Sequence, residues 1–402
     1  MPLDNPWILG LAQCVPVGLL SIAMALLLRR VHCPGGRCSA ALIAGVAAGI
    51  ILGAGVLGRI VPAAYQPVYV GGSAESAELL RLRERQQAEL SALVTSGVTD
   101  TAIDDLRRQH QEQAAPLVDS LSLVTGTHRR QFDLLVAAIA ALHAALASFL
   151  ATARPARAWL KTAACAIDTR WRDAAWGSLA LLLAGAIPFA VAHWALGMDF
   201  RLSLGTAAAL AAPGLSGTMP ARTFIACAVG LALAAAWLVI AAWSLPLSIV
   251  AAGVAIGLLG ALWSDRRVPA PTIRLIARLS AGVTLPLLAA LLTVTLDPHA
   301  IAASQPFIAA GILAALLSSD GRWAAARAAQ SLTHAGLRGA WTRAGESVSA
   351  GSSTCQLLAA AALGWLGAPP FLIASLLLGA IVIELSSRPR AELSRLFDQG
   401  RE

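Results

Sequence analysis

The chain has 402 residues, of which 57% are hydrophobic and 13% are charged, and its mean hydropathy is +0.70. A soluble domain of this length fills its core with far less apolar sequence, so the composition excludes that class and predicts an all-α polytopic membrane protein. The net charge of +8 follows from where Lys and Arg lie between the apolar segments, and nucleic acid is not an expected partner.

Apolar segments of membrane-spanning length recur about eleven times along the chain. They lie at 7–28, 39–59, 132–152, 174–196, 203–219, 223–243, 246–263, 282–297, 304–319, 349–366 and 370–387. Most of the 30 Lys and Arg fall in every second short connection, and the short connections between those carry only Arg201. Because basic short loops stay in the cytoplasm, this pattern predicts a bacterial-type inner-membrane protein with its N-terminus outside and its C-terminus cytoplasmic.

The spans divide the chain into four predicted domains. These are two transmembrane helices in 1–62, a periplasmic helical insertion in 63–131, the remaining transmembrane helices in 132–387, and a basic cytoplasmic tail in 388–402. The second span carries glycines at intervals of about four residues, at Gly45, Gly49, Gly53 and Gly55, which is typical of close helix packing. Cys33 and Cys38 flank a Pro-Gly-Gly turn beside His32, and we favour a turn with incidental thiols over a metal site. No metal or other cofactor is expected.

The insertion has the pattern of a helical hairpin. Ser73 to Val94 is polar with leucines near helical spacing, Gly97 breaks the helix, and Thr99-Asp100 can cap a second arm that ends near Gln113, before Pro116. The apolar face of the first arm consists of Leu79, Leu82, Leu90 and Leu93. Two interpretations remain open for that face: a lid on the protein's own outer surface, or a docking element for another protein or a second copy of this chain.

His143 lies near the middle of the third span. An ionisable side chain inside a membrane is a functional hypothesis by default, although a neutral imidazole bonded to a neighbouring carbonyl is the interpretation that we favour. Further along, 153–173 is a basic amphipathic connector suited to anionic headgroups. The stretch 272–280, with Arg274 and Arg278 one turn apart, is typical of a helix on the cytoplasmic surface.

A backbone break at membrane depth, at 211–218, is the predicted site of a transport path. A break leaves backbone N–H and C=O groups that need a protein-enclosed cavity, and the polar or helix-breaking residues there would line it. The candidates at this break are Pro213, Gly214, Ser216 and Thr218, together with His143. The family resemblance described below implies a second break, whose polar candidates are Ser352, Ser353, Thr354 and Gln356. Nearby acids have simpler explanations, since Glu346 lies three residues after Arg343 and Glu384 lies one turn before Arg388.

Five stretches of small and aliphatic residues carry a family resemblance. They are AGIILGAGVLGRIVP at 48–62, LSLGTAAALAAPG at 202–214, VAAGVAIGLL at 250–259, LPLLAALLTVTLD at 285–297 and GESVSAGSSTCQ at 345–356. In this order they resemble the conserved helices of monovalent cation:proton antiporters of the Kef and NapA kind, in a divergent form shortened by two spans. The resemblance implies an antiporter fold in which 202–214 and 345–356 are discontinuous helices, and a monovalent cation or proton as the ligand.

The residues that carry exchange in that family are missing here. Matched on Pro213, the family's Thr and its Ser or Asp fall on Ala211 and Ala212, and its carboxylate pair falls near 229–231. No Asp or Glu lies between Asp199 and Asp265. The resemblance therefore implies exchange chemistry that is altered or lost, and the alternative is a non-transporting scaffold subunit that docks partners through the hairpin and the basic cytoplasmic loops. No hydrolase, zinc-protease or P-loop motif occurs in the sequence, and an enzyme is not expected.

Overall fold

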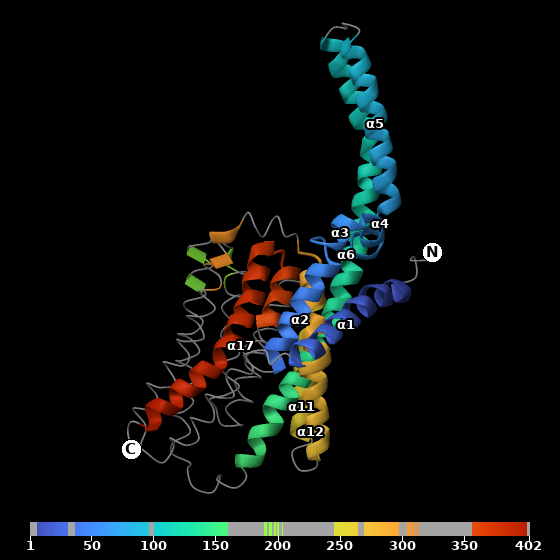
Figure 1. Cartoon of the computed structure of the whole chain (residues 1–402). Helices are drawn as coiled ribbons and strands as arrows, with labels where there is room; N and C mark the ends of the chain where they lie inside the picture. The colour runs from blue at the N-terminus through green and yellow to red at the C-terminus, as the bar shows by residue number, and fades with distance from the viewer. Residues whose placement is uncertain are drawn as a thin grey trace. The chain divides into compact units, whose positions relative to one another are not determined.

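The computed structural model is helical throughout its described elements (Figure 1). It describes residues 6–30, 37–95, 100–159, 189–190, 193–194, 197, 199–200, 203, 245–263, 269–296, 304–306, 308–309, 312 and 356–399. Four helices are long and apolar enough to cross a membrane: Ile8–Arg30, Ser39–Ile60, Ile103–Leu150 and Pro271–Val294. These helices confirm a helical membrane protein.

Three shorter apolar helices fall within further predicted spans. They are Ser248–Gly257, Gln356–Trp365 and Pro370–Val382. Most residues of the predicted spans between 174 and 243, and most of 304–319, lie outside the described residues. The total of about eleven spans therefore stays a prediction.

The chain forms two compact units. The hairpin unit comprises Met1–Gln13 and Val56–Asp133, and the bundle unit comprises Cys14–Gly55 and Leu134–Glu402. The 60-residue helix α6 (Asp100–Trp159) contributes residues to both units. α1 (Pro6–Arg30) also contributes to both, because its first residues pack in the hairpin unit.

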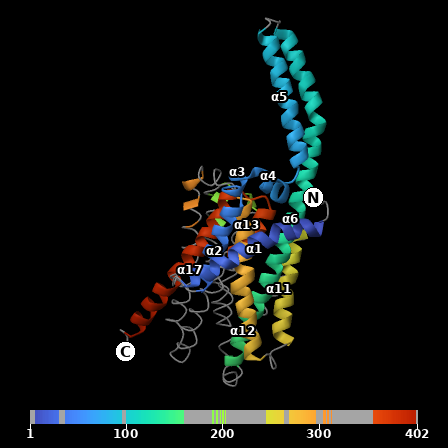
Figure 2. The same cartoon turned by 45° about the vertical axis from the view of Figure 1, so that its right-hand side comes forward.

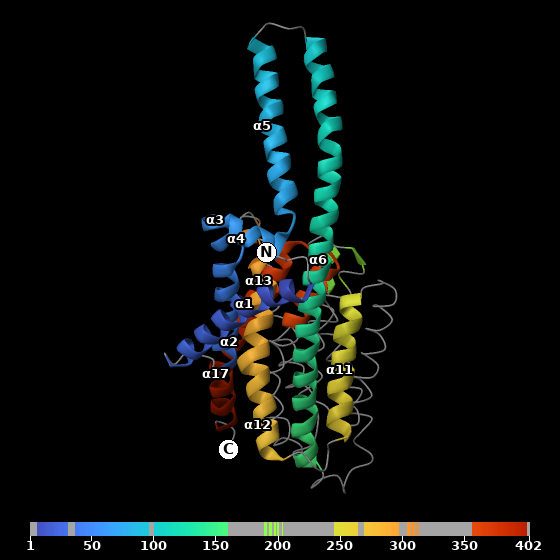
Figure 3. The same cartoon turned by 90° about the vertical axis from the view of Figure 1, so that its right-hand side faces the viewer.

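The hairpin unit confirms the predicted pair of helical arms. Figures 1 to 3 show α5 (Ser73–Thr95) beside the first half of α6. The predicted end of the second arm near Gln113 is wrong, because α6 continues through Pro116. A proline inside a helix removes one N–H donor and displaces the carbonyl four residues earlier, here that of Glu112. Both residues are exposed, so water can satisfy that carbonyl and the helix continues.

A polar clamp fixes the start of the hairpin. Three short helices, α3 (Leu57–Ile60), α4 (Pro62–Tyr65) and η1 (Gln66–Val70), lead into a turn in which Gly71 has a φ of 78°. The carbonyl of Val68, near the end of η1, accepts from Gln13 Nε2 at 2.8 Å and from His128 Nε2 at 2.8 Å. Because a carbonyl only accepts, His128 carries its proton on Nε2. Two side chains from distant segments thus cap one helix end.

Glycines bring α2 (Arg37–Leu52) and α13 (Leu285–Val294) into direct backbone contact within the bundle unit. A Cβ atom on Gly45 would lie 2.8 Å from Ala289 Cβ, and one on Gly49 would lie 2.5 Å from the carbonyl oxygen of Ala290. At the end of this seam the Ala54 N–H donates to the Val294 carbonyl at 3.4 Å. The predicted packing role of these glycines is confirmed.

The segment from 270 to 294 forms one span that combines three elements. α12 (Ala270–Leu279) continues through the π-helical turn η4 (Ser280–Thr284) into α13. The helix predicted over 272–280 is confirmed as α12, and η4 joins it to α13 within the candidate membrane span Pro271–Val294. Its place on the cytoplasmic surface stays a prediction. The last helix, α17 (Pro370–Gln399), likewise extends beyond the span end predicted at 387.

The glycine seam predicts opposite effects for two Gly→Ala substitutions. Gly49→Ala places a methyl group against the α13 backbone, and we expect a loss of roughly 1–3 kcal/mol in the free energy of unfolding. Gly126→Ala, in an exposed part of α6 where a Cβ meets nothing within 4 Å, should instead gain about 0.5–1 kcal/mol through helix propensity. Thermal unfolding of the detergent-purified protein, followed by circular dichroism, measures both. Equal melting temperatures for Gly49→Ala and wild type would contradict the seam.

Candidate functional site

His143 is a buried polar side chain in the membrane-spanning part of α6. It is 1% exposed, and its Nδ1 lies 2.7 Å from the Thr284 hydroxyl of η4. That hydroxyl donates its proton to the carbonyl of Ser280 at 3.1 Å, which leaves its lone pairs for a proton on Nδ1. The imidazole is therefore satisfied at Nδ1 by a hydroxyl, where the sequence suggested a carbonyl.

Pro286 explains the π turn that places Thr284 beside His143. In η4 the Leu285 N–H donates to the carbonyl of Ser280, five residues earlier. If this five-residue spacing continued, the Ala281 carbonyl would accept from the N–H of residue 286, but residue 286 is a proline and has no N–H. The Arg29 guanidinium of α1 donates to this carbonyl from Nη2 at 3.5 Å. Local π geometry and a side chain from a neighbouring helix together compensate for the proline.

A second glycine seam fixes the opposite side of α6. Gly253 and Gly257 of α11 (Leu245–Trp263) pack against the backbone of Ala141 and Ala145. His143 lies between these alanines in sequence and points to the other side of the helix, as the 3.6-residue period requires. Figure 3 shows this part of α6 between α11 and the α12–η4 helix. The imidazole is therefore held between two tightly packed layers.

Of the candidate residues at the second predicted break, the structure describes Gln356. Gln356 is 0% exposed, and within the described part of the chain neither its amide oxygen nor its amide nitrogen has a hydrogen-bond partner. The other break candidates, which are Pro213, Gly214, Ser216, Thr218, Ser352, Ser353 and Thr354, lie outside the described residues. Glu384, which the sequence places near the cytoplasmic end of the last span, is buried in α17 at 4% exposure. The structure thus places one amide of the second break, and a carboxylate from a different helix, in the protein interior.

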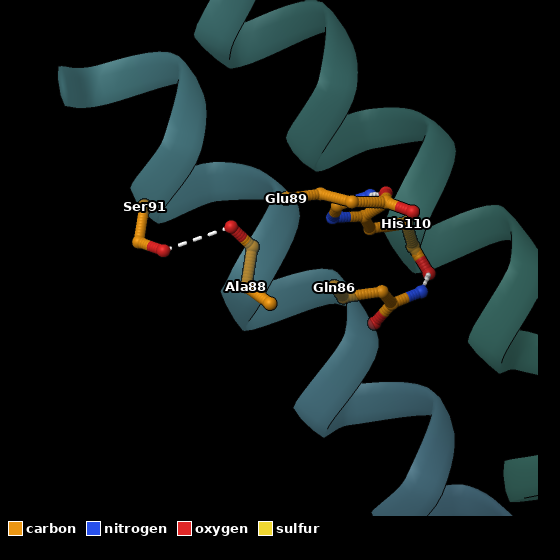
Figure 4. Close-up of polar contacts among 5 residues, drawn as sticks. All are labelled: Gln86, Ala88, Glu89, Ser91 and His110. Carbon is orange, nitrogen blue, oxygen red and sulfur yellow. Dashed lines mark hydrogen bonds and ion pairs between the residues drawn. The ribbon is translucent and has the colours of Figure 1, made fainter. Parts of the chain in front are cut away.

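The predicted docking leucines face the second arm of the hairpin. Leu79 is buried, and Leu82, Leu90 and Leu93 are half-buried. Gln86 belongs to the same helix face by its spacing, and its Nε2 donates to the carbonyl of His110 in α6 at 3.0 Å (Figure 4). The leucine face therefore contributes to packing within the hairpin, and its part in docking a partner stays a prediction.

A histidine and a glutamate join the two arms at the same level. His110 is 6% exposed, and its Nε2 lies 3.0 Å from Glu89 Oε2 of α5, as Figure 4 shows. Because a carboxylate accepts, the imidazole donates from Nε2 to Glu89. Together with the Gln86 bond, this contact fixes the register of the arms. Because the Glu89 side chain is 62% exposed, the pair adds little stability, and its main effect is to fix which residues of the two arms face each other.

Several of these polar contacts were not predicted from the sequence. The roles of Thr284 and Arg29 could have been predicted from the sequence. Backbone carbonyls freed by a proline commonly accept from a threonine close to that proline or from a basic residue at a span end. His110 could have been identified from its helical spacing with Ile103 and Leu106 on the inner face of α6. The clamp between Gln13, Val68 and His128 had no local signal.

The described residues contain no group of three or more His, Cys, Asp or Glu side chains placed to hold a metal ion. The side chains of Cys33 and Cys38 lie outside them. Comparisons of the chain with family models, with characterised proteins and with solved structures give no match. The resemblance to cation:proton antiporters therefore stays a prediction from the sequence motifs.

A double-mutant cycle tests the contact between His143 and Thr284. Thr284→Val keeps the shape and removes the hydroxyl, and His143→Leu removes the imidazole. We expect each single variant to lower the free energy of unfolding and the pair to show a coupling of about 0.5–1.5 kcal/mol, because either change alone leaves a buried polar partner. Reversible thermal or denaturant unfolding in detergent provides the four values. Strictly additive effects would show that the two side chains do not depend on each other.

Proposed function

We propose that this chain is an antiporter-like membrane protein whose exchange chemistry is altered, with His143 and Glu384 as its working ionisable groups. The observation that carries the proposal is the burial of an imidazole, 1% exposed, inside a membrane-spanning helix. Ionisable side chains are costly at that depth and occur mostly on ion paths and proton relays. The buried Glu384 supplies a carboxylate in the same unit.

The chemistry of these two groups explains why the exchange would differ from that of the family. An imidazole can take up and release one proton but offers nitrogen, which hard cations bind poorly. A carboxylate offers the oxygens that such cations prefer, and it can also hold a proton. Dividing the two roles between His143 and Glu384 separates proton binding from cation binding, which a single carboxylate combines in the family.

Proteoliposomes containing the purified protein test this assignment. An imposed Na⁺ or K⁺ gradient should drive proton flux, and His143→Asn and Glu384→Gln should each reduce the flux about tenfold or more, since each removes the titratable group. Glu84→Gln, which changes an exposed carboxylate on α5, is the matched control and should keep wild-type flux. Flux equal to that of empty liposomes across a broad series of ions and pH values would show that exchange has been lost.

A scaffold role is the second candidate, and the hairpin favours it. Several large apolar side chains of the arms are exposed to solvent, including Leu80 at 59%, Val94 at 62% and Leu123 at 72%. Exposed apolar side chains on a rigid helical pair are suited to a helix-packing partner, either another protein or a second copy of this chain.

The scaffold role predicts a complex that depends on the hairpin. After purification in mild detergent, the protein should keep a stoichiometric partner or a second copy, measured as the mass of the particle. Leu80→Ser together with Leu123→Ser should release it, and Arg85→Gln, an exposed polar change on the same arm, should not. Deleting residues 74–128 should have the same effect as the leucine variant. A monomer that transports ions would contradict this candidate.

A further inference from the structure

Three arginines of the bundle unit lie along one face of the α12–η4 helix, two of them on α12 and the third reaching it from α1. Arg274 and Arg278 are exposed on α12 and lie one turn apart. The next position on that face is Gly282, and a Cβ there would lie 3.5 Å from the guanidinium Nη2 of Arg29, which comes from α1. At 1.5 Å rise per residue, the three guanidinium groups attach along about 12 Å of helix.

Within the part of the chain that the structure describes, no ion pair neutralises these positive charges. The ion pairs among the described residues lie on the hairpin arms, and none of them involves the three arginines. Arg29 donates to the Ala281 carbonyl, yet its buried Nε has no hydrogen-bond partner among the described residues. Like charges this close repel one another in the absence of an anion, so the arrangement favours a bound one.

Apolar side chains adjoin the arginines on both helices. Leu275 and Leu279 are 56% and 42% exposed on α12, and Leu26 and Leu27 are 55% and 61% exposed in the last turns of α1 before Arg29. A soluble anion gains nothing from leucines, whereas a phospholipid places its phosphate and its acyl chains next to each other. Arg29 lies at the end of the candidate span Ile8–Arg30, and Arg274 and Arg278 lie near the start of the candidate span Pro271–Val294. Span ends are where headgroups are found.

We propose that Arg29, Arg274 and Arg278 bind the headgroup phosphate of an anionic phospholipid, with its acyl chains lying over Leu275, Leu279, Leu26 and Leu27. Arginine suits this role because its planar guanidinium donates two parallel hydrogen bonds to phosphate oxygens. Arg29 also satisfies the Ala281 carbonyl, so a lipid bound there would stabilise the π turn that presents Thr284 to His143. The inference does not depend on whether exchange is retained.

Lipid binding to the full-length protein in detergent tests the site. Fluorescent phosphatidylglycerol should bind at least tenfold more tightly than fluorescent phosphatidylcholine. Arg274→Gln with Arg278→Gln should remove most of that preference, and the double Lys variant should keep it within about threefold, because the charge is retained. Arg81→Gln with Arg85→Gln is the matched control, since these arginines form an exposed i,i+4 pair on α5. Circular dichroism verifies that each variant is folded.

Three results would overturn the proposal. The first is equal affinity of the wild-type protein for the two lipids, and the second is an unchanged preference in the double Gln variant. The third is displacement of phosphatidylglycerol by glycerol phosphate at equal concentration, because a soluble headgroup lacks the acyl chains that the leucines contact. A Gln variant that loses the preference while the α5 control keeps it supports the assignment.

Discussion

The bundle unit depends on one constraint, which is that every backbone carbonyl inside a membrane needs a donor from the protein. Pro286 removes such a donor in the middle of the span Pro271–Val294. The helix responds by widening to a π turn, and Arg29 reaches the carbonyl of Ala281 from another helix. The same turn aims Thr284 at His143. One missing N–H thus connects the helix geometry, the position of an arginine and the environment of the buried imidazole.

Glycine seams make this arrangement rigid. α13 meets the backbone of α2 through Gly45 and Gly49, and α6 meets α11 through Gly253 and Gly257. At such contacts a helix cannot slide by a fraction of a turn without a clash between backbone atoms. A change at the π turn is therefore expected to shift whole helices, and not single side chains, when the protein passes from one state to another.

The sequence predicted features that depend on local pattern and missed those that depend on distant partners. Span positions, the hairpin and the packing role of Gly45 and Gly49 followed from hydropathy and spacing, which are properties of neighbouring residues. The predicted end of the second arm near Gln113 was wrong, because α6 accommodates Pro116 on an exposed face. The clamp of Gln13 on Val68 joins positions 55 residues apart, and the bond between His143 and Thr284 joins positions 141 apart. No local signal specifies such pairs.

The two functional candidates make different demands on the same helices. Exchange needs an ionisable group that meets each side of the membrane in turn, so the helices that hold it must have two arrangements. A scaffold needs one arrangement only. The π turn provides a physical basis for the first demand, because a switch of the Leu285 N–H from the carbonyl of Ser280 to that of Ala281 would convert η4 into α-helix. That switch would rotate Thr284 away from His143 and would release Arg29 from the Ala281 carbonyl. A protein that serves only as a scaffold does not need this second arrangement of η4. The ability of the Leu285 N–H to change its acceptor from Ser280 to Ala281 is therefore the structural property that distinguishes the two functions.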